Sequence, residues 1–151
     1  MGDALAGRVA LVTGASRGIG SATAVRLAES GYRLVLHGHR AEAVTEAAET
    51  ITEKYGVTVL TAHGDIADPA TSKALMQVAF SNFKRLDALV VNAGTHAAGM
   101  LGMTDDATIQ RLFAVNAAGA AYTLRGAARL LTRGSNPAVV LVSSISALDA
   151  A

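Results

Sequence analysis

Short apolar runs alternate along the chain with longer stretches in which apolar residues recur at helical spacing. The short runs are rich in β-branched residues and apolar on both faces, as in strands that are buried on both sides of a parallel sheet. They are "RVALVT" (8–13), "YRLVLH" (32–37), "VTVLTA" (57–62), "LDALVVN" (86–92) and "AVVLVS" (138–143). The stretches between them predict helices near 18–30, 40–55, 69–83 and 104–133. Together they predict one α/β unit, a parallel sheet covered by helices.

Two of the predicted helices begin at residues that favour a helix start. Asp68 precedes Pro69, which is typical of an N-cap followed by proline at the first helical position. Thr104 can cap the fourth helix in the same way. Asp105 and Asp106 are then favourable charges in its first turn, with no catalytic role.

The fourth helix also predicts a buried stripe. Ile109, Leu112, Phe113 and Asn116 stand at positions i, i+3, i+4 and i+7, so they share one helix face. A buried amide needs hydrogen-bond partners. Asn116 is therefore either part of a structural network or a functional group that faces a cavity.

Composition narrows the range of functions. The 151 residues are 51% hydrophobic with a net charge of +1, which suits a single globular domain and favours no nucleic-acid surface. The absence of cysteine excludes disulfides, thiol catalysis and Cys-ligated metals. His37 and His39 alternate on one strand, but no carboxylate or cysteine cluster accompanies them, so no metal site is predicted. No leader and no run long enough to span a membrane is found, and a cytoplasmic protein is expected.

A glycine-rich turn, "TGASRGIG" (13–20), joins the first strand to the first helix. Gly14 permits a tight turn, Gly18 lets the backbone approach a pyrophosphate, and Gly20 lets helix and strand pack closely. The helix N-terminus offers free N–H groups to phosphates. A βα turn can also need glycine for purely conformational reasons, and that alternative stays open here.

The residues after the second strand bear on the choice of cofactor. An acidic residue normally holds the adenosine ribose of NAD there, but Gly38 stands near that position and Glu42 is the first carboxylate beyond it. A 2′-phosphate would instead meet Arg40 and Arg17, with the imidazole of His39 as a further candidate, since guanidinium groups suit phosphate oxygens. NADP is therefore expected, with NAD the less favoured cofactor. The alternative is that Arg40 is simply a solvated residue at a helix start.

Three polar residues follow strands: Asp65, Asn92 and Ser144. Ligands bind at the carboxyl ends of parallel strands, so all three are expected in one crevice. Asp65 and Asn92 could each also be an ordinary turn residue. Their joint placement favours a site.

These motifs, in order from residue 8 to residue 144, closely resemble the short-chain dehydrogenase/reductase family in its three-layer Rossmann form. The resemblance implies that the glycine loop binds the cofactor pyrophosphate and that other matching positions contact the adenine ring and line the cofactor cleft. It also implies that Ser144 hydrogen-bonds the substrate oxygen and that Asn116 holds a water in a proton relay. The implied cofactor-binding residues are Gly14, Ser16, Arg17, Gly18, Ile19, Gly20, His39, Arg40, Asp65, Ile66, Asn92, Ala93 and Gly94.

In such enzymes a Tyr-x-x-x-Lys pair completes the site, on the helix after the serine strand. None of Tyr32, Tyr55 and Tyr122 is followed by lysine four residues later. The resemblance therefore implies an NADPH-dependent carbonyl reductase or alcohol dehydrogenase acting on a small molecule, with that activity expected of a longer parent chain. The alternative is a dinucleotide-binding module without chemistry.

Two further expectations concern the whole molecule. Members of the family usually assemble as dimers or tetramers, so a homo-oligomer is expected. The last apolar strand would be an uncovered sheet edge, which predicts that the 151-residue chain is marginally stable or aggregates.

Overall fold

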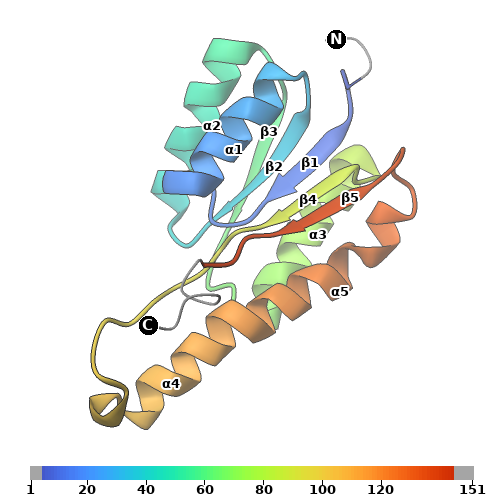
Figure 1. The fold of residues 1–151 in the computed structure, drawn as a ribbon. Coiled ribbons are helices and arrows are strands. Elements are labelled where there is room, and N and C mark those ends of the chain that lie inside the picture. Colours follow the sequence, from blue (N-terminus) through green and yellow to red (C-terminus); the bar gives the residue numbers. More distant parts are fainter. Residues whose placement is uncertain (1–4, 145–151) are drawn as a thin grey trace.

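The structure is a computed structural model that describes residues 5–144. Five parallel strands form one sheet in the order β3-β2-β1-β4-β5 (Figure 1). The strands are β1 (Val9–Val12), β2 (Arg33–Gly38), β3 (Val59–His63), β4 (Ala88–Val91) and β5 (Ala138–Leu141). Each overlaps a predicted run, and the expected parallel α/β sheet is confirmed.

Helices connect successive strands. They are α1 (Gly18–Glu29), α2 (Ala41–Tyr55), α3 (Pro69–Phe83), α4 (Asp106–Phe113) and α5 (Gly119–Leu131). A 3₁₀ turn, η1 (Leu101–Met103), precedes α4, and a π-helix, η2 (Ala114–Ala118), joins α4 to α5. The single helix predicted over 104–133 is thus two α-helices with a π-helical segment between them.

Side chains of the central strands alternate between two apolar cores. In β1, Val9 and Leu11 belong to a core shared with α3 and α5, whereas Ala10 and Val12 belong to one shared with α1 and α2. All four are fully buried. Helices therefore cover both faces of the sheet, which explains why the central strands are apolar on both faces.

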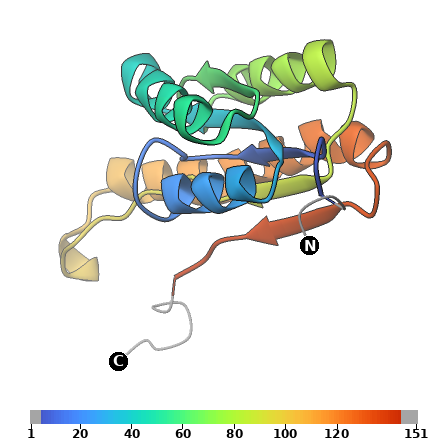
Figure 2. The same ribbon diagram turned by 90° about the horizontal axis from the view of Figure 1, so that it is seen from above.

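Strand β5 differs from the central strands. All four of its residues are exposed, and Leu141 keeps 57% of its accessible surface. Figure 2 shows the strand at the outer edge of the sheet. The prediction that this strand is buried on both faces is therefore wrong. No described helix covers it in the way that helices cover β1 and β4.

Of the two predicted N-caps, one is confirmed and the other is wrong. The Asp68 carboxylate accepts the backbone N–H of Ala70, as expected of the cap before Pro69. Thr104 is not the cap of α4, because Asp105 Oδ1 accepts the N–H of Thr108 at 2.7 Å. The carboxylate one position later takes the role that the threonine was expected to fill.

The predicted buried stripe of α4 is also wrong. No residue of α4 is buried, and Phe113 is 67% exposed. Figure 1 shows α4 extending past the end of the sheet, where no strand lies beneath it. Helical periodicity marked an apolar face correctly but could not show whether anything covers that face.

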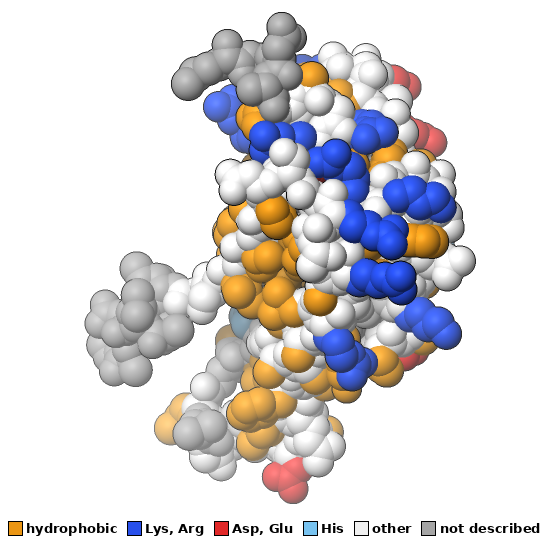
Figure 3. Space-filling model, turned by 90° about the vertical axis from the view of Figure 1, so that its right-hand side faces the viewer, with side chains coloured by type: hydrophobic (Ala, Val, Ile, Leu, Met, Phe, Trp, Pro, Cys, Tyr) orange, Lys and Arg blue, Asp and Glu red, His pale blue; other side chains and the backbone are white. Residues whose placement is uncertain are grey.

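Charge is unevenly distributed over the surface. Figure 3 shows Lys and Arg side chains in a band beside a hydrophobic area, on the side that faces right in Figure 1. No Asp or Glu occurs between residues 107 and 144, while Arg125, Arg129 and Arg133 are exposed. Among the described residues, no helix combines the length and apolar character that crossing a membrane requires.

Candidate functional site

A cleft of about 830 Å³ opens at the carboxyl ends of the strands. In the order 3-2-1-4-5 the chain reverses direction across the sheet between β1 and β4, and ligands of open parallel sheets bind at such a switch point. Most of the residues singled out in the sequence meet there. Those that line the cleft are Gly14, Ser16, Arg17, Gly18, Ile19, His39, Asp65, Ile66, Asn92, Ala93 and Gly94.

The glycine loop is shaped by close backbone contacts. A Cβ on Gly20 would lie 2.2 Å from the carbonyl oxygen of Gly14, and a Cβ on Gly14 would lie 2.9 Å from Cα of Ala93. Gly20 is buried beneath the loop and does not line the cleft. Gly18 is different, since a Cβ there would meet no atom within 4 Å while its φ of +59° favours glycine. The loop is therefore tight underneath and open on the side of the cleft.

The first helix leaves its N-terminus available to a ligand. Its N-cap is Arg17, whose side chain makes no capping hydrogen bond, and no acidic residue stands in the first turn. The first N–H groups of a helix have no intrahelical acceptors and carry a partial positive charge. Opening into a cleft behind a glycine loop, they form a site suited to an anion such as a pyrophosphate.

Asn92 holds the glycine loop from the neighbouring strand end. Its Nδ2 donates to the carbonyl oxygens of Thr13 and Gly14, each at 3.1 Å. The hydroxyl of Thr13 accepts the N–H groups of Asn92 and Ala93, each at 3.0 Å. Thr13 is fully buried and was not singled out in the sequence, although a hydroxyl residue ending an apolar strand was a usable signal.

The adenosine end of the expected site has no room for an acidic side chain at Gly38. A Cβ there would lie 2.8 Å from Cβ of Val44. Arg17 and His39 are exposed and line the cleft, whereas Arg40 is exposed at the N-cap of α2 and is not among the lining residues. Within the described part of the chain, neither arginine forms an ion pair.

Asp65 is held by a residue that the sequence did not single out. Both of its oxygens accept from the Arg111 guanidinium, at 2.5 and 3.1 Å, and Oδ1 also accepts the N–H of Ala67. The hydrogen bond from Arg111 lowers the pKa of the Asp65 carboxyl. Arg111 comes from α4 and lines the same cleft. Asp65 thus serves both as a turn carboxylate and as a cleft residue, two alternatives that the sequence left open.

Asn116 forms a local network in the π-helix. Its Nδ2 donates to the carbonyl oxygen of Thr95, and its Oδ1 accepts the N–H of Thr95, both at 2.8 Å. The residue is exposed, but its amide has the partners that an amide needs. Asn116 does not line the cleft but fixes Thr95, which does. π-helical turns inside α-helices are frequently found at functional sites.

Ser144 follows β5 and is exposed. It is not among the residues that line the cleft. Within residues 5–144 no group of three or more His, Cys, Asp or Glu side chains could hold a metal ion.

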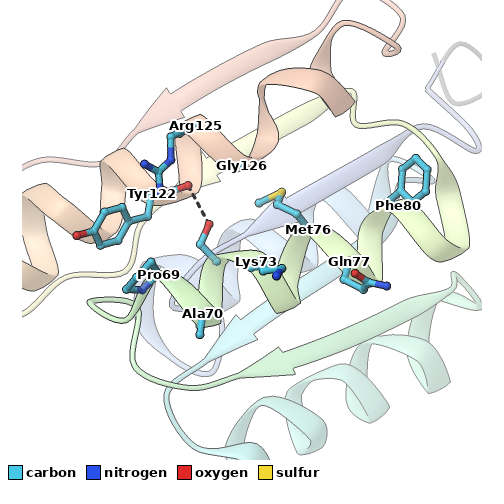
Figure 4. Close-up of a pocket in the computed structure, with 10 residues that line it drawn as sticks. Pro69, Ala70, Lys73, Met76, Gln77, Phe80, Tyr122, Arg125 and Gly126 are labelled. Atoms are coloured by element: carbon cyan, nitrogen blue, oxygen red, sulfur yellow. Dashed lines mark hydrogen bonds between the residues drawn. The ribbon is translucent and has the colours of Figure 1, made fainter.

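A second hollow, of about 590 Å³, lies between α3 and α5. Figure 4 shows Met76 pointing from α3 toward α5 and Tyr122 and Arg125 on the opposite wall. The hydroxyl of Ser72 donates to the carbonyl oxygen of Tyr122 at 2.9 Å and so ties the two helices together. No predicted site residue lies in this hollow, which is the groove where α3 and α5 pack against each other.

Comparison with known proteins decides the family. The sequence model of the short chain dehydrogenase family matches residues 8–151. The chain belongs to the short-chain dehydrogenase family. The expected Rossmann-type fold is confirmed as well, because solved structures of the family superpose on most of the chain.

Relatives of this chain are dehydrogenases and reductases by name. L-rhamnose 1-dehydrogenase (NAD(P)(+)) of Sphingomonas sp. (strain SKA58) is 36% identical over 148 residues, which are 95% of this chain and 57% of that protein. Versicolorin reductase 1 of Aspergillus parasiticus is 36% identical over 144 residues, 95% of this chain and 54% of that protein. The chain therefore spans about half the length of these relatives.

Two solved structures show the same fold with different cofactors. L-sorbose reductase from Gluconobacter frateurii, complexed with NADPH and L-sorbose, matches at a TM-score of 0.90 and 33% identity, over 95% of this chain and 54% of that one. Carveol dehydrogenase from Mycobacterium avium, in complex with NAD, matches at 0.88 and 26% identity, over 95% of this chain and 57% of that one. This short-chain dehydrogenase fold thus carries either nicotinamide dinucleotide in its relatives.

Proposed function

We propose that this short-chain dehydrogenase chain is the cofactor-binding part of an oxidoreductase that moves hydride between NADP(H) and a carbonyl/alcohol pair. The observation that carries the proposal is the glycine loop, which opens an uncapped helix N-terminus into the cleft at the switch point of the sheet. When bound, the nicotinamide dinucleotide supplies the hydride chemistry. The chain's own residues bind and orient it.

The residues of the cleft fit such a cofactor. Backbone atoms pack so tightly under Gly14 and Gly20 that side chains there would fill the loop, while the space beside Gly18 is free for a pyrophosphate. Ile19 is 65% exposed and gives the cleft an apolar wall. Asp65 and Ile66 are suited to the adenine end, and the backbone at Asn92 to Gly94 to the nicotinamide half.

Preference for NADP rests on the region around Gly38. A carboxylate that would bind the ribose hydroxyls of NAD has no space there, because Val44 occupies it. The exposed Arg17 and His39 line the cleft beside it, and Arg40 stands one residue further on. A 2′-phosphate would therefore meet positive charge rather than a carboxylate. L-sorbose reductase, to which the chain is similar, was crystallised with NADPH.

Isothermal titration with NADP⁺ and NAD⁺ tests this preference. Wild type should bind NADP⁺ more tightly than NAD⁺. Arg17→Ala should weaken NADP⁺ binding about tenfold, because one charge-assisted contact to the 2′-phosphate is lost. It should change NAD⁺ binding little. Arg40→Ala, measured separately, reports whether the residue at the α2 N-cap contributes. Arg26→Ala is the matched control, because Arg26 pairs with Glu29 on α1 outside the cleft. Tighter binding of NAD⁺ by wild type would contradict the preference.

Ser144 and Asn116 are proposed to act on the substrate side. A hydroxyl at the end of β5 can donate to a substrate oxygen and stabilise the charge that develops there. Asn116 holds the backbone of Thr95 at the rim of the cleft and thus supports the nicotinamide half. In this proposal Ser144 orients the substrate. Asn116 fixes the backbone of Thr95 beside the proton relay.

A dinucleotide-binding module without chemistry is the second candidate, favoured by the position of the tyrosines. Tyr32 is buried, Tyr55 donates to Glu29, and Tyr122 faces the hollow between α3 and α5, so no tyrosine lines the cleft in the described part of the chain. Mixing the chain with NADPH and a panel of ketones separates the two candidates. Consumption of NADPH, followed by absorbance, supports the oxidoreductase, while cofactor binding without consumption supports the module.

We further propose a cytoplasmic homo-oligomer that acts on a small molecule. The relatives named above are dehydrogenases and reductases of small molecules, and exposed apolar residues remain on α4 and β5. Light scattering coupled to size exclusion measures the oligomeric state directly. A monomer at all concentrations would contradict this part of the proposal.

A further inference from the structure

The imidazole of His37 lies buried under the cleft and joins two of its walls. Its Nδ1 faces the backbone N–H of Gly14 in the glycine loop at 3.4 Å. Its Nε2 faces the carbonyl oxygen of Gly64, in the turn before Asp65, at 3.1 Å. The carbonyl of His37 itself accepts the N–H of Ala15 at 2.8 Å. One residue at the end of β2 thus contacts both the glycine loop and the turn that carries Asp65.

These partners allow only one protonation state. A backbone N–H can only donate and a backbone carbonyl can only accept, so Nδ1 must be bare and Nε2 must carry the proton. A second proton on Nδ1 would set two N–H donors against each other at Gly14. The hydrogen bond to the glycine loop would be lost while the one to Gly64 remained.

The surroundings of His37 favour the neutral ring. The side chain is 2% exposed, and burial lowers its pKa below the usual 6.5, against the opposing effect of the hydrogen bond to Gly64. The charges of His39 and His63 act in the same direction as burial, and Asp65 acts against it. Asp65 is itself paired with Arg111, and Arg17 lines the same cleft as His37.

We propose that neutral His37 is a positioning residue that holds the glycine loop at the correct distance from the Asp65 turn, so that dinucleotide affinity falls in mild acid. The proposal rests on the function proposed above, because it concerns how that cofactor is held. His37 does not touch the phosphates. It acts through Gly14 and Gly64, to which its two ring nitrogens are hydrogen-bonded.

The direction of the pH effect follows from linkage. If binding requires the neutral ring, each bound dinucleotide must displace a proton below the pKa of His37, and the dissociation constant rises about tenfold per pH unit there. Well above its lowered pKa the ring is neutral, and affinity should be constant there. His39 is exposed in the same cleft, so the His39→Asn variant serves as the control for the second histidine.

The experiment combines imidazole NMR with titration calorimetry on wild type, His37→Asn and His39→Asn between pH 5 and 8. NAD⁺ is the probe, because its phosphates stay ionised over this range and it lacks a 2′-phosphate. Long-range ¹H–¹⁵N spectra of wild type should show the Nε2–H tautomer of His37 and protonation below pH 6.5. Calorimetry should show affinity falling in acid for wild type and His39→Asn, but staying level for His37→Asn, whose amide oxygen can accept from Gly14 without titrating.

The outcomes separate the two proposals. Binding of NAD⁺ at pH 8 with the same pH profile in wild type and His37→Asn overturns the role of His37 and leaves the cofactor assignment standing. An Nδ1–H tautomer, or an imidazolium at pH 7, overturns that role even if His37→Asn does not fold. Failure of both NAD⁺ and NADP⁺ to bind wild type at pH 8 overturns the proposed function, and the role of His37 with it.

Discussion

Two glycines of the cofactor loop are needed for different reasons. Gly20 lies where the carbonyl oxygen of Gly14 and the amide of Asn92 leave no space for a Cβ, whereas Gly18 has space but a positive φ. Asn92 is held against the loop by its hydrogen bond to the same Gly14 carbonyl. A side chain at position 20 would therefore disturb both the fold and the cleft.

Replacing Gly20 with alanine should lower stability by about 1–3 kcal/mol, the usual cost of overpacking, because the new methyl group meets backbone. The shifted loop should also lose most of its affinity for NADP⁺. Thermal melting and calorimetry measure the two effects. Gly102→Ala is the matched control, since a Cβ there meets nothing within 4 Å and φ is not in the left-handed region. Equal melting temperatures for the two variants would contradict the packing argument.

How much of the site could be predicted varied from residue to residue. Asp65 and Asn92 were found because each follows a strand in the sequence, and strand ends share one edge of a parallel sheet. Their partners were not, since Arg111 is 46 residues from Asp65 and Thr13 is 79 from Asn92. Such pairings depend on how strands and helices are ordered in space. The local sequence pattern does not contain that information.

Among the secondary-structure elements, the starts of β1 and β4 are joined by one carboxylate. Asp87 Oδ2 accepts the N–H of Val9 at 2.8 Å, and Oδ1 accepts the N–H of Ser135 at 2.6 Å and a hydrogen bond from Arg85. Its side chain is fully buried. Burial alone would raise the pKa of Asp87, but the bonds from Arg85, Ser135 and Val9 outweigh burial and hold it below its usual 3.8.

Asp87→Asn should destabilise the protein by about 1.5–3 kcal/mol at pH 7, because Arg85 and the N–H groups of Val9 and Ser135 lose a charged acceptor. The carboxylate stabilises the fold only while ionised, so the advantage of wild type should be complete above pH 3.8 and disappear as the pH falls through the lowered value. Urea titrations at several pH values measure this difference. Asp106→Asn, on the exposed first turn of α4, should change little at any pH. A wild-type advantage that survives at low pH would argue against the ionised carboxylate as its source.

Helix α4 is attached to the cleft through polar contacts rather than a core. None of its residues is buried, and the ion pair from Arg111 to Asp65 is its long-range tether among the described residues. A helix without buried apolar contacts belongs to the least stable part of a fold.

Arg111→Met should therefore loosen α4 without unfolding the sheet. Amide hydrogen exchange should quicken across Asp106–Phe113 and stay unchanged in β1 and β4. Arg125→Met, which removes an exposed arginine from α5, serves as the control. Unchanged exchange in α4 would show that the helix is held by something other than the ion pair.

At the scale of the whole molecule, strand β5 leaves a continuous run of apolar side chains exposed. Val139, Val140 and Leu141 keep 42%, 52% and 57% of their accessible surface. β5 pairs only with β4 among the described strands, so its other edge offers unpaired backbone groups. An apolar strand edge of this kind favours pairing with another chain.

The 151-residue chain should therefore self-associate as its concentration rises. Leu141→Lys should reduce this association, because a charge on the strand opposes both edge pairing and apolar contact. Thr132→Lys adds the same charge at the exposed end of α5 and should have little effect. Analytical ultracentrifugation measures the difference. A monodisperse wild-type monomer with a cooperative melt would contradict the prediction.

The sequence by itself determined the parallel α/β architecture, the glycine loop and the polar residues at the strand ends. These features are local, since periodicity, turn residues and caps act over a few neighbouring positions. Only the tertiary structure decided that Phe113 is exposed and that His37 contacts both Gly14 and Gly64. Exposure and pairing depend on which elements lie opposite one another, and that is fixed by strand order and by where the sheet ends.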